Sequence, residues 1–158
     1  MKLATFSTAI DDRYLEDYIP GATYQFGDIG VDAEEIVEFA SRYDPQAIHL
    51  DPAAAEKGPF AGLIASGWQT GGLMMRLFVE HYLSSVASIA SPGIDELRWL
   101  KPVRPGDRLS LRVTVVEILP SRSKPDRGIL RSLIEVQNQD GAVVMSMVAM
   151  NMILKRPV

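Results

Sequence analysis

The chain has 158 residues, of which 47% are hydrophobic and 23% are charged, and its formal net charge at pH 7 is −4. This length suits one domain with a sizeable core, and this composition argues against a disordered chain. The negative charge disfavours nucleic acid or an anionic membrane as the main partner, because both need a surplus of Lys and Arg on one face.

The cellular compartment is indicated by two absences. The chain contains no cysteine, which excludes disulfides, thiolate metal sites and a cysteine nucleophile and fits a reducing compartment. The first residues lack a long apolar run before Asp11 and Asp12, so we expect no signal peptide. These two absences lead us to expect a cytoplasmic protein. From the chain length we expect a single domain over residues 1–158.

The first predicted helix covers residues 33–43. Asp32 is a candidate N-cap with Glu35 three residues later, and apolar residues then recur at helical spacing. The helix should end at 43 or at Asp44, because a residue that precedes proline, here Pro45, is disfavoured in the α conformation. Asp44 is thus expected on a turn at a helix end.

A second, short helix is predicted over residues 52–57. Asp51 is its N-cap, Pro52 takes the first helical position and Gly58 follows its last residue. His49 is then expected in a non-helical stretch between the two helices.

The third and longest helix is predicted to begin at Ser66, a good N-cap. Its apolar residues point in every direction, which predicts a helix buried on all sides. Arg76, Glu80 and His81 interrupt the apolar run before it could span a membrane. Gly71-Gly72 costs helix propensity, so we expect a close approach of backbone or ligand there.

Beyond residue 92 the pattern changes to strands. Four are predicted, over 94–103, 108–118, 128–138 and 142–154, with an early strand near 22–27. The connections are mostly short. These elements predict an α+β fold in which one antiparallel sheet curls around the long helix.

Asp44 and His49 are the residues best suited to proton transfer. His49 is one of only two histidines, imidazole titrates near neutral pH, and a nearby carboxylate can fix its tautomer. Each residue also has a structural explanation. Asp-Pro is a common turn-forming pair, and a lone histidine is more often a hydrogen-bonded structural residue than a catalytic one. A metal site that adds Asp51 is less favoured, since the spacing matches no established zinc motif.

Three segments carry a resemblance to a known family. The segments 44–51, 60–68 and 96–107, which begin at Asp44, Phe60 and Glu96, resemble the MaoC-like dehydratases. This is the hotdog-fold family that includes the (R)-specific enoyl-CoA hydratases, and the resemblance covers most of residues 20–154. Gln46 and Ala47 stand where the hydratases usually have asparagine and proline.

The resemblance implies a hydro-lyase on a hotdog fold. Asp44 and His49 would activate water for addition to a trans-2-enoyl thioester, or catalyse the reverse dehydration. The backbone N–H of Gly67, at a helix N-terminus, would stabilise negative charge on the thioester oxygen. Ser66 would orient the substrate or the acid–base pair, although helix capping explains it equally well. Which of Asp44 and His49 is the base stays open at this stage.

The resemblance also implies an acyl-CoA substrate, with coenzyme A as part of the substrate and neither a separate cofactor nor a metal. Lys101 and Arg104 are candidates for contacts with the CoA phosphates, as are the basic residues Arg122, Lys124 and Arg127. Solvated surface charge explains each of them as well.

A homodimer, or a higher oligomer built from dimers, is the implied assembly. The 94–103 strand and the central helix would pair across a two-fold axis, with Leu97 and Trp99 near the contact.

Two other functions are compatible with the same fold. The first is a hotdog acyl-CoA thioesterase, whose acid would lie on the central helix, where Glu80 is the only carboxylate. The second is an inactive acyl-CoA-binding module, since fold alone does not determine function.

Overall fold

The structure is a computed structural model and describes residues 2–158. The helices are α1 (Ala33–Tyr43), α2 (Ala47–Leu50), α3 (Pro52–Lys57) and α4 (Gly67–His81), preceded by two short 3-10 turns, Ile10–Asp12 and Leu15–Asp17. The strands are β1 (Thr23–Gly30), β2 (Ser88–Trp99), β3 (Arg108–Pro120), β4 (Arg127–Gln137) and β5 (Val143–Leu154).

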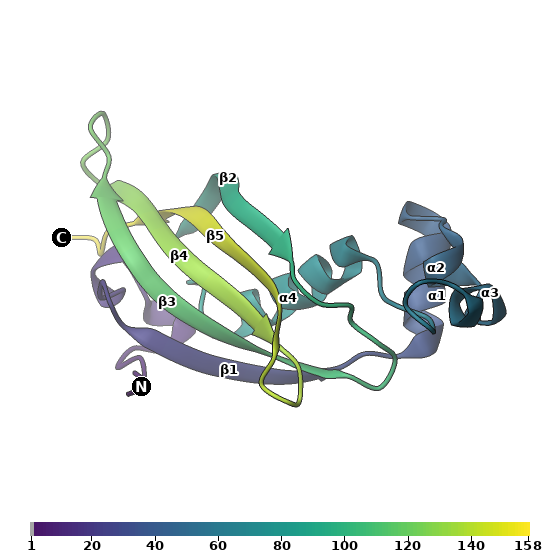
Figure 1. The fold of residues 1–158 in the computed structure, drawn as a ribbon. Coiled ribbons are helices and arrows are strands. Elements are labelled where there is room, and N and C mark those ends of the chain that lie inside the picture. Colours follow the sequence, from purple (N-terminus) through teal and green to yellow (C-terminus); the bar gives the residue numbers. More distant parts are fainter. Residues whose placement is uncertain (1) are drawn as a thin grey trace.

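The five strands form one antiparallel sheet in the order β1-β3-β4-β5-β2. In β4 buried and half-buried residues alternate strictly, so one face of the sheet is turned to the core. Figure 1 shows α4 running behind the sheet, with α1, α2 and α3 gathered beyond one end. The predicted α+β architecture, an antiparallel sheet around a long central helix, is confirmed.

The contact between α4 and β1 depends on a glycine. Gly27 has φ +80°, a left-handed conformation that favours glycine, at an irregularity in the pairing of β1 with β3. A Cβ atom at this position would lie 2.7 Å from Leu77 Cδ2. The absence of a side chain therefore lets α4 pack closely against the strand.

The far end of α4 is fixed by buried hydrogen bonds. The Tyr82 hydroxyl lies 2.7 Å from Ser132 Oγ on β4, and the Tyr18 hydroxyl donates to the Tyr82 carbonyl at 2.8 Å. Burial raises the pKa of Tyr18 to about 12, so its hydroxyl is a donor over the whole physiological range. These bonds hold α4 in register with the sheet.

The stretch around His49 differs from the prediction. It was expected to be non-helical, but residues Ala47–Leu50 form the single turn α2. Pro45 excludes the α conformation only for Asp44, and Gln46 starts a new turn by accepting a bond from the Leu50 amide. His49 consequently lies on a helical turn, which points its ring back toward Asp44.

The prediction that α4 is buried on all sides is wrong. One face packs on the sheet through Met74, Leu77 and Phe78, whereas Trp68 is 61% exposed and Met75 and Val79 are also exposed. The apolar residues outside the packed face have nothing to cover them within one chain.

No close approach of protein backbone is found at Gly71-Gly72 within the described chain. A Cβ at Gly72 would meet no atom within 4 Å, and one at Gly71 would make only an ordinary contact, with Met145. The helix instead leaves open space beside Gly72.

The strand predicted over 94–103 is shifted in the structure. β2 begins at Ser88 and ends at Trp99, and it contains Pro92 and several register irregularities against β5. Because β2 is an edge strand, the missing N–H of Pro92 can face away from the ladder. No helix in the described part of the chain has the length and apolar character required to cross a membrane.

Candidate active site

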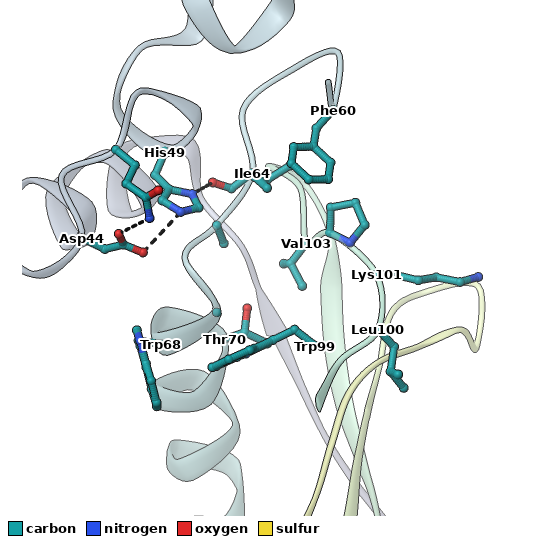
Figure 2. A pocket seen from close by; sticks show the side chains of 14 residues that line it. Asp44, His49, Phe60, Ile64, Trp68, Thr70, Trp99, Leu100, Lys101 and Val103 are labelled. Carbon is teal, nitrogen blue, oxygen red and sulfur yellow. Dashed lines mark hydrogen bonds and ion pairs between the residues drawn. The ribbon is translucent and has the colours of Figure 1, made fainter. Parts of the chain in front are cut away.

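Asp44 and His49 face each other in the structure. Asp44 is the first residue after α1, and the turn through Pro45 and α2 brings the imidazole back over it. His49 Nε2 lies 3.3 Å from Asp44 Oδ2, as Figure 2 shows. The two titratable residues singled out from the sequence therefore form one pair.

The tautomer of His49 is fixed by a backbone carbonyl. His49 is only 5% exposed, and its Nδ1 lies 2.7 Å from the Ile64 carbonyl oxygen. That oxygen can only accept, so Nδ1 carries a hydrogen and donates it. The Ile64 amide is bonded in turn to the Ile48 carbonyl, and the next amide, Ala65, to the Val103 carbonyl. The neutral imidazole therefore presents an unprotonated Nε2 to Asp44.

Two side chains hold the Asp44 carboxylate as an anion. Gln46 Nε2 donates to Oδ1 at 2.6 Å, and Ser66 Oγ donates to Oδ2 at 2.7 Å. These two hydrogen bonds, that of Gln46 first, lower the pKa of Asp44 below its usual value. Asp44 is therefore a carboxylate at neutral pH.

The pair can hold one exchangeable proton. An ionised carboxylate and an unprotonated Nε2 are both acceptors, so direct contact between them requires a proton on one of them. A water molecule that donates to both acceptors would satisfy the same two atoms. The geometry is that of a group able to take a proton from water and return it to a nearby atom.

The N-terminus of α4 lies beside this pair. Ser66 is fully buried and is the N-cap, since its Oγ accepts the Trp68 amide at 3.3 Å while donating to Asp44. Gly67 is the first residue of α4, so its N–H has no acceptor within the helix. That free amide and the helix dipole favour a negatively charged oxygen at this position.

Trp99 closes over Gly67. A Cβ atom at Gly67 would overlap the Trp99 indole ring, which in turn meets Trp68 edge-on with 5.0 Å between ring centroids. A close approach of a side chain to the α4 backbone is thus found at the start of the helix. Only glycine allows the indole to lie against the α4 backbone here.

These groups border a cavity of about 400 Å³, within the range of small-molecule sites. Most of its wall is apolar, and Figure 2 shows the pair on one side and the two tryptophans on another. The lining residues are Asp44, Gln46, His49, Phe60, Ile64, Ala65, Gly67, Trp68, Thr70, Trp99, Leu100, Lys101, Pro102 and Val103.

The basic candidates lie in different places. Lys101 lines the cavity and is exposed, whereas Arg104 does not line it and donates instead to the Phe60 carbonyl at 2.6 Å. Arg122 and Lys124 belong to the β3–β4 hairpin, which Figure 1 places at the end of the sheet away from α1, α2 and α3. The structure therefore brings only Lys101 into the cavity wall.

The remaining carboxylate near the pair is a helix cap. Asp51 Oδ1 accepts the amides of Ala53 and Ala54 at 3.1 Å each, which confirms its role as the N-cap of α3. Within residues 2–158 no group of three or more Asp, Glu or His side chains is placed to hold a metal ion.

Two contributors to the site were missed from the sequence. Gln46 was noted only as a departure from the usual asparagine, but its amide binds Asp44, and its place two residues after the acid was an available signal. The Ile64 carbonyl that fixes the His49 tautomer had no sequence signal, because any residue supplies a carbonyl.

Comparisons with known proteins agree with this geometry. The family model described as "MaoC like domain" matches residues 17–138. A solved structure of a MaoC-like dehydratase from Rhodospirillum rubrum superposes with a TM-score of 0.86 at 39% sequence identity, covering 92% of this chain and 99% of that one.

Two curated relatives are also similar over most of their length. Uncharacterized protein YdeM of Bacillus subtilis is 34% identical over 79% of this chain and 87% of its own. A 3-hydroxybutyryl-CoA dehydratase of Methylorubrum extorquens is 30% identical over 70% of this chain and 69% of its own. Together with the antiparallel sheet around α4, these matches show that the chain belongs to the hotdog-fold family of MaoC-like dehydratases.

Proposed function

We propose that this protein is a hydro-lyase that adds water to a trans-2-enoyl thioester, or removes water from the corresponding 3-hydroxyacyl thioester. The observation that carries the proposal is the 3.3 Å approach of His49 Nε2 to Asp44 Oδ2 in the wall of the cavity. The dehydratase activity named for the Methylorubrum relative supports the same reaction class.

The pair supplies the proton transfers that hydration needs. Water bound between the carboxylate of Asp44 and Nε2 of His49 loses a proton to the pair as its oxygen bonds to the β-carbon. The electron pair of the double bond moves toward the thioester carbonyl, and the α-carbon then takes up the proton that the pair received from the water, which returns the pair to its starting state. In dehydration the same steps run backwards: the α-proton leaves, and the 3-hydroxyl departs as water. Positioned acid–base groups of this kind contribute typically 10²–10⁴-fold.

The Gly67 amide is proposed as the stabiliser of the enolate-like oxygen. Charge develops on the thioester oxygen as water adds, and a fixed N–H at a helix N-terminus favours that charge in the transition state. Ser66 is proposed as a positioning residue, because its hydroxyl reaches Asp44 and not the open cavity. These roles would divide the site into an acid–base side and an oxyanion side.

Coenzyme A is the proposed carrier of the acyl group. Lys101, exposed beside the cavity, is the better placed candidate for a phosphate contact. Arg104 would have to break its hydrogen bond to the Phe60 carbonyl to contact a phosphate, so it is the less favoured candidate. No separate cofactor and no metal are part of the proposed reaction.

A homodimer, or an oligomer built from dimers, is the proposed assembly. β2 is a sheet edge, and Ile89, Ile94 and Trp99 on it are exposed, as are Met75 and Val79 on α4. An apolar surface of this kind commonly marks an interface. A cytoplasmic location, expected from the absence of cysteine, belongs to the same proposal.

The test is a screen of purified protein against short, medium and branched trans-2-enoyl-CoA thioesters. Loss of the absorbance of the conjugated thioester, without release of free thiol, would support hydration. Thiol release would instead identify a thioesterase. A thioesterase is disfavoured because Glu80, the only acid on α4, is exposed at the far end of the helix and pairs with Arg76. Calorimetric binding without any turnover would identify an inactive binding module.

A further inference from the structure

Trp99 lies beside the proposed oxyanion site. It is the last residue of β2, which pairs with β5, and the next amide, of Leu100, donates to the Val144 carbonyl at 2.8 Å. Its ring lies against Gly67 at the start of α4 and meets Trp68 edge-on. Ordered elements of the fold therefore hold the indole at the wall of the cavity.

The nitrogen of this indole is close to the Gly67 amide. A Cβ atom at Gly67 would lie 2.5 Å from Trp99 Nε1, and standard bond lengths and angles put a Cβ about 2.5 Å from its own amide nitrogen. The sum of these distances puts the two nitrogens at most about 5 Å apart. One oxygen about 2.9 Å from each nitrogen can accept from both, because that arrangement allows donor separations of up to about 6 Å.

The amide and the indole face the same space. The first N–H groups of a helix have no partner within it and point out of its N-terminus, and each Cα–Cβ bond is tilted toward that end as well. The indole occupies the place of a Gly67 Cβ, so it lies on the side toward which the amide points. Gly67 and Trp99 both line the cavity that Asp44 and His49 border.

The indole nitrogen can only donate a hydrogen bond. Trp99 is 45% exposed, and in Figure 2 no hydrogen bond joins it to another residue of the cavity wall. Two adjacent donors favour an oxygen of the ligand as their shared acceptor, and most strongly an oxygen that carries negative charge.

We infer that the Trp99 indole N–H is a second hydrogen-bond donor to the thioester oxygen, alongside the Gly67 amide. The inference rests on the proposed hydratase function. The thioester oxygen gains negative charge as water adds to the β-carbon, and it loses that charge when the α-carbon takes up the proton. A second fixed donor stabilises the charged oxygen of the transition state more than the neutral thioester. Trp99 is thus assigned a catalytic role in addition to its place in the wall.

The first test is Trp99→Phe, which removes the N–H and keeps an aromatic ring. With a trans-2-enoyl-CoA that wild type hydrates, we expect kcat to fall at least 10-fold, since one oxyanion donor typically contributes about 10²–10³-fold. KM should change less than kcat, as expected for an interaction that is strongest in the transition state. Thermal unfolding of both proteins checks that the variant is folded.

A closer isostere of the indole is 3-benzothienylalanine, in which sulfur replaces the N–H and the ring shape is kept. The chain has two tryptophans, so the analogue is incorporated into Trp68→Phe protein, where it enters only at residue 99. The control is the same Trp68→Phe protein with its ordinary Trp99. We again expect kcat to fall at least 10-fold.

A spectroscopic readout of the same bond needs no turnover. Butanoyl-CoA labelled with carbon-13 at the thioester carbonyl lacks the double bond and is not hydrated, and hydrogen bonds to its oxygen lower the carbonyl stretching frequency. Infrared difference spectra should show a lower frequency for this ligand in wild type than in Trp99→Phe. A ring that acts only by packing would leave the frequency unchanged.

The outcomes separate this inference from the proposed function. If wild type hydrates an enoyl thioester and loss of the indole N–H leaves kcat unchanged, the inference is wrong while the hydratase function stands. If wild type hydrates no thioester, the proposed function fails and the inference with it. Equal carbonyl frequencies for butanoyl-CoA bound to wild type and to Trp99→Phe would overturn the inference whatever the activities.

Discussion

The Ser66 hydroxyl donates to Asp44 Oδ2 at 2.7 Å. This is the same carboxylate oxygen that faces His49 Nε2, and Ser66 is also the N-cap of α4. One buried hydroxyl therefore links the start of the central helix to the acid–base pair. The position of Asp44 is set by α4 as well as by α1, the helix that it follows.

Replacing that hydroxyl should affect both stability and catalysis. Ser66→Ala removes a cap, which costs about 0.5–2 kcal/mol of unfolding free energy. It also removes a bond that lowers the pKa of Asp44, so that pKa should rise. We expect kcat to fall about 10-fold and the acidic limb of the pH–rate profile to move to higher pH. Ser66→Thr keeps a hydroxyl and should therefore retain most of the stability and most of the kcat. Equal losses in the alanine and threonine variants would contradict the positioning role.

Gln46 offers a second way to change the pKa of Asp44. Its amide donates to Asp44 Oδ1 and is the largest cause of the lowered pKa. Gln46→Leu should therefore raise the pKa of Asp44 and move the acidic limb of kcat/KM upward, whereas Gln46→Asn tests the residue usual in the hydratases. An acidic limb that is unchanged in Gln46→Leu would show that this bond does not govern the titration.

The same pKa shift predicts how stability depends on pH. Because the pKa of Asp44 is lower in the folded than in the unfolded protein, its contribution to stability is present above the ordinary carboxyl pKa and is lost as pH falls through the lowered folded value. Asp44→Asn should therefore lose less unfolding free energy than wild type between pH 5 and pH 3 in urea titrations. Parallel losses would contradict this.

The oxyanion role of Gly67 can be tested by removing its N–H. Proline is favoured at the first position of a helix, and the extended conformation of Ser66 (φ −57°, ψ 139°) suits a following proline. Because a side chain at Gly67 would overlap Trp99, the comparison is made in a Trp99→Ala background. Gly67→Pro should lower kcat by about 10²–10³ relative to Gly67→Ala, with similar melting temperatures. Equal kcat values in the two double variants would show that the Gly67 N–H does not stabilise the transition state.

The exposed apolar residues predict a dimer. Ile94 on the edge strand β2 and Val79 on α4 are both about half exposed, and a partner chain would cover them. Wild type should sediment as a dimer, and Ile94→Lys should shift it toward monomer and lower its melting temperature at micromolar concentration. Lys155→Ala, a change on the exposed C-terminal segment, is the control. A wild type that is monomeric at all concentrations would contradict the assembly.

Much of this architecture could be predicted from local signals. The bounds of α1 and α3 follow from the N-caps Asp32 and Asp51, and both caps are found in the structure. The error at α2 arose because the proline rule acts on one residue only, so a single helical turn can resume at once. Periodicity also could not say that one apolar face of α4 would be left uncovered, since it reports apolar character and not what packs against it.

The acid–base pair could be predicted from the sequence, but the groups that contact the site from distant segments could not. Asp44 and His49 were identifiable because both titrate and a turn separates them. The Ile64 carbonyl and the Trp99 ring come from segments 15 and 32 residues away in sequence from the groups that they contact, His49 and Gly67. Such contacts depend on the folded path of the chain between residues 58 and 99. Local sequence patterns do not encode that path.

Hydration of a trans-2-enoyl-CoA by wild type, Asp44→Asn and His49→Gln is the most direct test of the proposed acid–base pair. With melting temperatures confirming that all three are folded, each substitution should lower kcat by at least 10²-fold, because the transfer of the water proton needs both groups. Activity in wild type that survives both substitutions within a few fold would contradict the account.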